Sequence, residues 1–186
     1  MSKIEVLANR YRNHVAAPWQ RNLAGEQKII FVVYPQGDER RFRARMKLFE
    51  MATLESQHKW RLLDFTQTFA RWMAGLEYRQ AYFEEPENLA LPLKTEFPMF
   101  AAGKLRKVLT DEGVDSDTVV AVYGVASFYG FTRVSMVLDK VAGDIRGRLL
   151  VFFPGEFENN NYRLLGVRDG WNYLAVPITL HNGVND

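Results

Sequence analysis

Three short apolar runs without polar alternation constrain the fold of this chain more than any other feature of its sequence. Residues 28–34, 119–123 and 148–153 are rich in β-branched and aromatic side chains, and each run is followed directly by proline or glycine. Strands without polar alternation are buried on both faces, which is typical of a parallel sheet covered by helices. The three runs therefore predict the central strands of an α/β domain.

Amphipathic segments and two weaker strands complete this pattern. Apolar residues predict helices over residues 3–16, 38–56, 66–83, 96–111 and from the turn at 124–130 to 141. Further strands are expected over 60–65 and over 173–177, the second at an edge because it contains Pro177. Residues 84–94 and 156–170 are expected to be loops. The result is a three-layer, open, mainly parallel sheet of about five strands with helices on both faces, Rossmann-like or similar to a degenerate P-loop domain.

The length of the chain favours one domain. A protein of 186 residues and 21.5 kDa buries about 70% of the surface of its extended chain. The sequence has no internal repeat and no linker, so residues 1–186 are expected to form a single α/β domain that includes the N-terminal helix. No apolar run is long enough to span a bilayer, and the N-terminus does not resemble a secretory leader. We therefore expect a cytoplasmic protein.

The composition excludes several kinds of chemistry. The sequence contains no cysteine, which excludes disulfides, thiolate metal sites and cysteine nucleophiles. Its histidines, His14, His58 and His181, are too scattered along the chain to indicate a zinc site. The net charge of +2 indicates little about partners. We therefore expect neither a metal nor a cofactor.

Ligands of an open α/β sheet bind beyond the carboxyl ends of the strands. There, the turn from Gly124 through Ser127 to Gly130 could present backbone amides to a phosphate, with Arg133 and Glu156 as further candidate ligands. No Gly-Lys-Ser/Thr follows, and the turn does not match a Gly-x-Ser-x-Gly nucleophile elbow. We therefore favour a structural role for these glycines. The carboxylates of Asp64, Glu156 and Glu158 could share a crevice, but Asp64 is better explained as a cap and the glutamates as solvated charges.

Two surface patterns point to macromolecular partners. Aromatic residues gather around the proline-bearing segment, and we expect the following to form a protein interface: Tyr78, Tyr82, Phe83, Phe97 and Phe100. Residues 40–47 place several cations on one helix, and such a face can follow phosphates. A solvated helix face explains these cations better, because the total charge is balanced and no nucleic-acid motif is present.

Seven segments of the sequence together carry a resemblance to a known family: residues 43–50, 78–86, 119–124, 131–135, 146–156, 160–165 and 169–175. They resemble the BrxB family of bacterial BREX (bacteriophage exclusion) defence systems, a domain of unknown function, and the resemblance extends from about Lys28 to Ile178. BREX systems also encode an ATPase, a DNA methyltransferase and a phosphatase-like PglZ protein. The family has no assigned catalytic residues, so the resemblance implies a subunit of a multi-protein system, with PglZ as the first partner to expect.

Three functions remain open from the sequence. The first is a non-catalytic adaptor that contacts PglZ or another BREX protein through the aromatic interface. The second is a degenerate nucleotide- or phosphate-binding domain, with the ligand at Gly124, Ser127, Gly130, Arg133 and Glu156. The third is an accessory subunit that contacts DNA weakly or indirectly through residues 40–47.

Overall fold

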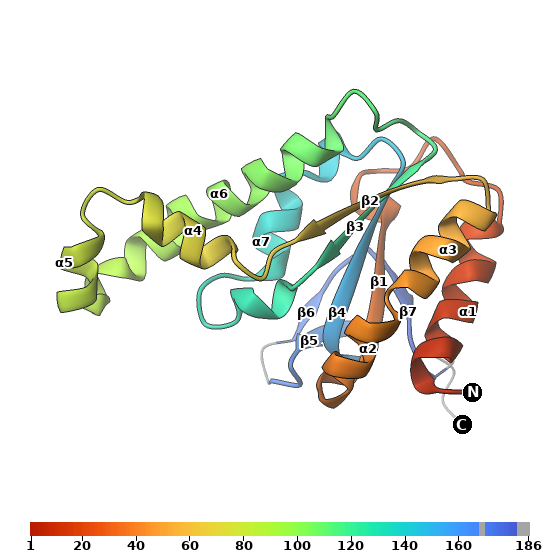
Figure 1. The fold of residues 1–186 in the computed structure, drawn as a ribbon, viewed down its shortest axis with the longest axis horizontal. Helices are drawn as coiled ribbons and strands as arrows, with labels where there is room; N and C mark the ends of the chain where they lie inside the picture. Colours follow the sequence, from red (N-terminus) through yellow and green to blue (C-terminus); the bar gives the residue numbers. More distant parts are fainter. Residues whose placement is uncertain (168–169, 182–186) are drawn as a thin grey trace.

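The computed structural model describes residues 1–167 and 170–181, and its centre is a parallel β-sheet (Figure 1). The strand order is β2-β3-β4-β1-β7, and every neighbouring pair in this path is parallel. The strands are β1 (Ile29–Tyr34), β2 (Lys59–Asp64), β3 (Thr118–Tyr123), β4 (Arg148–Glu158) and β7 (Val176–Ile178). The predicted mainly parallel sheet of an α/β fold is therefore confirmed.

Helices cover both faces of this sheet, which makes three layers (Figure 1). On one face lie α1 (Lys3–Ala16), α2 (Glu39–Arg45) and α3 (Lys47–Glu55), and on the other α6 (Ala90–Leu109) and α7 (Val134–Asp139), with α4 (Thr68–Gly75) packed against α6. Strand β1 serves both layers: Ile30 and Val32 belong to the core with α1 to α3, whereas Phe31 and Val33 belong to the core with α6 and α7. All six residues of β1 and of β3 are buried, as their apolar sequences predict.

The two outer strands of the parallel sheet differ from the central ones. Strand β7 lies at one edge and contains Pro177, so the predicted edge strand is confirmed, but at residues 176–178 in place of 173–177. Strand β2 lies at the other edge, and its side chains are partly or fully exposed, unlike those of β1 and β3. The exposed charges of Lys59 and Arg61 blunt this edge against pairing with another chain.

Strand β4 continues beyond the predicted end at Phe153. Pro154 stays in register with Tyr34 of β1, and the strand then turns to pair with an antiparallel hairpin. The hairpin consists of β5 (Asn161–Leu164) and β6 (Trp171–Asn172). Gly155 permits this pairing because a Cβ atom there would lie 2.0 Å from the carbonyl oxygen of Arg163. The loop predicted over residues 156–170 is therefore wrong for its strand-forming part.

Several predicted helices are divided into shorter ones. The helix predicted over 38–56 is interrupted at Met46 between α2 and α3. The helix predicted from the 124–130 turn to 141 contains only η4 (Val125–Phe128) and α7, because Gly124 and Gly130 adopt left-handed conformations. The short 3₁₀ turns elsewhere are η1 (Glu26–Lys28), η2 (Gln36–Asp38) and η5 (Ala142–Asp144).

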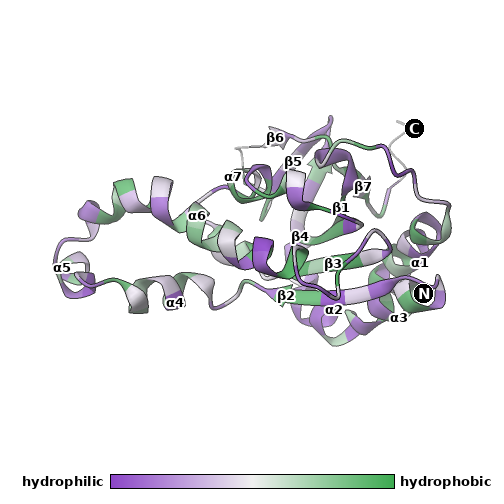
Figure 2. Cartoon of the chain, turned by 90° about the horizontal axis from the view of Figure 1, so that it is seen from above, coloured by the Kyte–Doolittle hydropathy of each residue, from purple (hydrophilic) through white to green (hydrophobic). Residues whose placement is uncertain are grey.

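A helical arm projects from the α/β body (Figures 1 and 2). It consists of α4, α5 (Arg79–Glu84), η3 (Pro86–Leu89) and the first half of α6. The loop predicted over residues 84–94 is therefore wrong, because η3 and the start of α6 occupy it. Pro92 is tolerated in the first turn of α6, where its missing amide hydrogen has no intrahelical partner to lose. Within the part of the chain that the structure describes, no helix is both long and apolar enough to cross a membrane.

Candidate functional site

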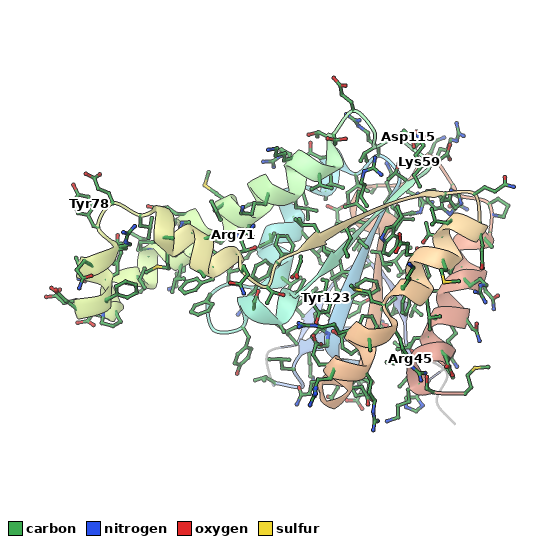
Figure 3. The ribbon with its side chains drawn as sticks, in the orientation of Figure 1. Arg45, Lys59, Arg71, Tyr78, Asp115 and Tyr123 are labelled. Atoms are coloured by element: carbon green, nitrogen blue, oxygen red, sulfur yellow. The ribbon has the colours of Figure 1, made fainter. Side chains whose placement is uncertain are left out.

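At the carboxyl edge of the sheet, side chains of α2 join the last residues of β1 and β3. The Tyr34 hydroxyl donates to Glu39 Oε2 at 2.6 Å, and the Tyr123 hydroxyl donates to Glu39 Oε1. The Nε of Arg43 donates to the Tyr123 hydroxyl at 2.9 Å, and its guanidinium carbon lies 5.1 Å from the Tyr123 ring centroid. The labelled Tyr123 lies at this edge of the sheet in Figure 3. Four side chains from β1, β3 and α2 thus form one hydrogen-bonded cluster.

Electrostatics keep both phenols protonated. Burial raises the pKa of Tyr34, and its hydrogen bond to Glu39 raises it further. Burial and the Glu39 carboxylate raise the pKa of Tyr123 to about 12. Each phenol therefore remains a hydrogen-bond donor at neutral pH and satisfies one oxygen of the carboxylate. These hydrogen bonds join β1, β3 and α2. Because both phenols are protonated at neutral pH, neither can act as a general base.

Features of the sequence point to this cluster. Tyr34 and Tyr123 each stand at the last position of an apolar strand, and Glu39 and Arg43 are four residues apart on one helix. The last residues of parallel strands lie at the same edge of a sheet, and i,i+4 spacing places the ion pair on one face. The strand order β3-β4-β1 could not be read from the sequence, so the approach of the two tyrosines across β4 was not predicted.

Gly124 and Ser127 occupy a packed turn. Gly124 has φ +81°, and a Cβ atom there would lie 2.6 Å from Thr66 Oγ1 and 2.8 Å from Asp64 Oδ1. The Ser127 hydroxyl lies 2.7 Å from the Gly124 carbonyl oxygen and 3.0 Å from the Phe65 carbonyl oxygen, to which it donates. Gly124 therefore allows the turn after β2 to pack against the end of β3, as the structural interpretation of these residues predicts.

The other candidate phosphate ligands lie in different places. Gly130 and Arg133 line a cavity of about 310 Å³ together with Tyr129, Leu164 and Trp171. Glu156 does not line it: this glutamate is exposed on β4, with its carboxylate close to Gly166. The five candidates are therefore not gathered around one ligand.

The candidate carboxylates are also explained by local structure. Asp64 Oδ1 accepts hydrogen bonds from the backbone amide of Thr66 at 2.8 Å and from its hydroxyl. These bonds close the turn after β2, whereas α4 begins at Thr68 without a side-chain cap, so the predicted helix cap at Asp64 is wrong. Glu158 is exposed at the end of β4. Among residues 1–167 and 170–181, no three histidine, aspartate or glutamate side chains form a group that could hold a metal ion.

The basic face of α2 is largely paired with carboxylates. Arg41 lies 3.2 Å from Asp38, and Arg43 lies 3.9 Å from Glu39. Arg45 lies 2.7 Å from Glu5 of α1. These pairs reduce the positive potential that residues 40–47 present to a polyanion.

The five residues predicted to form an aromatic interface differ in their exposure. Tyr78 and Phe83 are 69% and 63% exposed near the outer end of the arm, where Figure 3 labels Tyr78. Tyr82 and Phe100 are half-buried against the core. The prediction is wrong for Phe97, which is fully buried and contacts the rings of Phe69, Trp72, Phe128 and Phe131. Its position on α6 faces the body, and the sequence pattern alone did not distinguish this face from the outer one.

The outer end of the arm combines apolar and acidic side chains. Leu91 is 69% exposed, which adds a third apolar residue to Tyr78 and Phe83. An apolar groove between α4 and α5 is lined by Phe69, Met73 and Phe83, among others. Residues 77–87 include four glutamates and one arginine, all of them exposed. The outer end of the arm therefore exposes large apolar side chains in a segment with net negative charge.

Comparison with protein-family models, with curated proteins and with solved structures finds no match to this chain.

Proposed function

We propose that this protein is a non-catalytic adaptor subunit that binds a partner protein through its helical arm. The observation that carries this proposal is the exposure of Tyr78, Phe83 and Leu91 on an element that projects from the body. Large aromatic side chains bury much apolar area on binding and are enriched at the centres of interfaces. The resemblance to BrxB proteins, which rests on the segments quoted above, suggests a BREX defence complex and PglZ as the partner.

The charge of the arm defines the chemistry of its partner. The exposed glutamates Glu84, Glu85 and Glu87 surround the apolar residues at the outer end. A complementary surface has an apolar cleft that accepts Tyr78 and Phe83, rimmed by lysine or arginine. The same charges disfavour nucleic acid at this end of the molecule, because its phosphates are repelled.

The alternative functions have less support. A phosphate site at the carboxyl edge requires its ligands to converge, but Gly124 and Ser127 stabilise a turn while Arg133 and Glu156 lie apart. DNA contact through α2 requires basic side chains that are not already paired with carboxylates. Arg41, Arg43 and Arg45 each form such a pair. The adaptor function is therefore the one we propose.

Co-expression with the PglZ protein of the same locus tests this proposal. We expect the wild-type chain and PglZ to elute together in size-exclusion chromatography, with a defined stoichiometry by light scattering. The double variant Tyr78→Glu/Phe83→Glu is expected to elute separately. It places two charges where the proposed interface with PglZ would bury apolar side chains. Leu174→Glu is the matched control, since Leu174 is 70% exposed but lies on the body.

Two results would contradict the proposal at different points. Separate elution of the wild-type chain and PglZ would reject PglZ as the partner. Joint elution that the double variant does not disturb would reject the arm as the interface. Circular dichroism of each variant shows whether its fold is retained.

A further inference from the structure

A small basic cavity lies at the amino edge of the sheet, opposite the tyrosine cluster. It has a volume of about 180 Å³ and lies between the segment after α1 and the chain just before β2, β3 and β4. Three arginines line it: Arg21, Arg146 and Arg148. Figure 3 shows this edge at the top, where Lys59 and Asp115 are labelled at the starts of β2 and β3.

Arg148 is the most deeply placed of the three cations. It is 8% exposed, at the first position of β4. Its Nη1 donates to the Gly147 carbonyl oxygen and its Nη2 to the Gln20 carbonyl oxygen, both at 3.0 Å. Its guanidinium carbon lies 4.7 Å from the Trp19 ring centroid. Burial lowers the pKa of this guanidinium, because the charged form loses hydration.

The other two arginines add charge without adding a carboxylate. Arg146 Nη1 donates to the carbonyl oxygens of Val114 at 2.7 Å and Asp111 at 3.3 Å. Among the residues that the structure describes, none of the three guanidiniums lies within 4.0 Å of a carboxylate. Asp117 also lines the cavity, which leaves an excess of two positive charges in its lining. Arg148 is therefore a buried cation that contacts carbonyl groups and an indole ring, and such a charge is costly unless an anion balances it.

His58 and Trp19 form one wall of the cavity. The His58 ring stacks on Trp19 with centroids 3.7 Å apart, and both residues line the cavity. Because the Arg148 guanidinium lies against the same indole, the stack helps to hold this cation in place at the cavity.

We propose that this cavity binds a phosphate dianion, either free or as the terminal group of a small phosphomonoester. The volume is below the roughly 300–1,000 Å³ of sites for drug-sized ligands, which favours a small anion over a nucleotide. The faces of Trp19 are already covered by His58 and Arg148, so the indole offers no platform for a base. Guanidinium groups bind phosphate oxygens in pairs, and the dianion offsets the excess charge of the lining. This inference is independent of the proposed adaptor function.

Isothermal titration calorimetry with inorganic phosphate, at constant ionic strength in chloride, tests the proposal. We expect saturable binding to the wild-type chain, and Arg21→Gln is expected to weaken it about tenfold or more, since a charge-assisted hydrogen bond is lost. Arg21 is chosen because it is exposed, whereas a change at Arg148 would disturb the stack on Trp19. Arg40→Gln is the matched control: Arg40 is an exposed arginine at the opposite edge, on α2.

Two further probes distinguish the sources of the phosphate group. Methyl phosphate, a dianionic monoester, is expected to bind about as well as phosphate if the ligand is a phosphomonoester, and much more weakly if it is free phosphate. Dimethyl phosphate carries one charge, as a nucleic-acid backbone does, and is expected to bind at least about tenfold more weakly than phosphate. Imidazole resonances locate the site: phosphate is expected to shift those of His58, one of only three histidines.

The outcomes that overturn the proposal are separate from those for the adaptor. Absence of saturable phosphate binding would reject the site. Equal weakening by Arg21→Gln and Arg40→Gln, or unshifted His58 resonances during binding, would show that phosphate binds elsewhere. Tighter binding of dimethyl phosphate than of phosphate would reject the dianion.

Discussion

Gly124 shows how one residue decides the geometry of a turn. Its φ of +81° lies in the left-handed region, and a side chain there would meet Thr66 and Asp64 of the neighbouring turn. The glycine therefore serves two local needs at once, backbone conformation and close approach. Gly103 is the opposite case, because it lies inside α6 with nothing within 4 Å of its would-be Cβ.

A matched pair of alanine variants tests this difference. Gly124→Ala is expected to destabilise the fold by about 1–3 kcal/mol or more, since strain and a steric clash add. Gly103→Ala is expected to stabilise it by about 0.5–1 kcal/mol through helix propensity. Urea unfolding followed by circular dichroism measures both changes. A neutral Gly124→Ala would contradict the role given to this glycine.

At the scale of elements, the tyrosine cluster joins two strands to one helix. Tyr34 ends β1, Tyr123 ends β3, and both donate to Glu39 at the start of α2. Strand β4 lies between β1 and β3 in the sheet, so the cluster spans three strands. Open α/β sheets often bind a ligand beyond the carboxyl ends of their strands. In this protein, side chains of the fold are hydrogen-bonded to one another there.

Removing the Tyr123 hydroxyl is expected to lower the free energy of unfolding at neutral pH. At alkaline pH this difference from the wild-type chain is expected to disappear. The folded-state pKa of about 12 lies above the ordinary value of 10. The contribution of the protonated phenol is therefore complete below pH 10 and is lost as the pH rises through about 12. We expect Tyr123→Phe to cost about 1–2 kcal/mol at pH 7. Urea unfolding across pH 7–12 measures the difference from wild type, and a difference that does not shrink above pH 10 would contradict this account.

At the scale of the whole molecule, the body and the outer part of the arm differ in how many of their side chains are buried. The body has cores on both faces of the sheet, whereas neither α5 nor η3 contains a buried residue. Figure 2 shows the arm extending alone from the layers that cover the sheet. Segments with few buried apolar contacts open locally at low free-energy cost.

Hydrogen exchange is expected to separate the two parts. Amides of residues 79–89 are expected to exchange orders of magnitude faster than those of β1, β3 and residues 148–155 of β4, all of which are buried. Mass spectrometry of peptic peptides measures this, with α1 as a helical control that has a capping box and a buried face. Similar protection of the arm and the central strands would contradict the picture.

The sequence predicted the layers of this fold better than its connections. Buried strands lack polar alternation, so β1, β3 and most of β4 could be found, and Lys3–Ala16 has a clear apolar stripe. The α6 start was missed because Pro86 and Pro92 resemble loop residues, although the first turn of a helix tolerates proline, as α6 does at Pro92. Whether Phe97 and Phe83 are buried or exposed depends on which side of the arm packs against the body. The Tyr34–Tyr123 cluster depends on the order of strands in the sheet. The spacing of apolar residues along the sequence gives neither of these tertiary features.

The continuity of α6 gives the arm a mechanical meaning. This single helix of 20 residues is about 30 Å long, and its second half is embedded in the core through Ala101, Leu105 and Leu109. In the adaptor function proposed above, a partner bound at the outer end would lie at a distance from the sheet that the length of α6 sets.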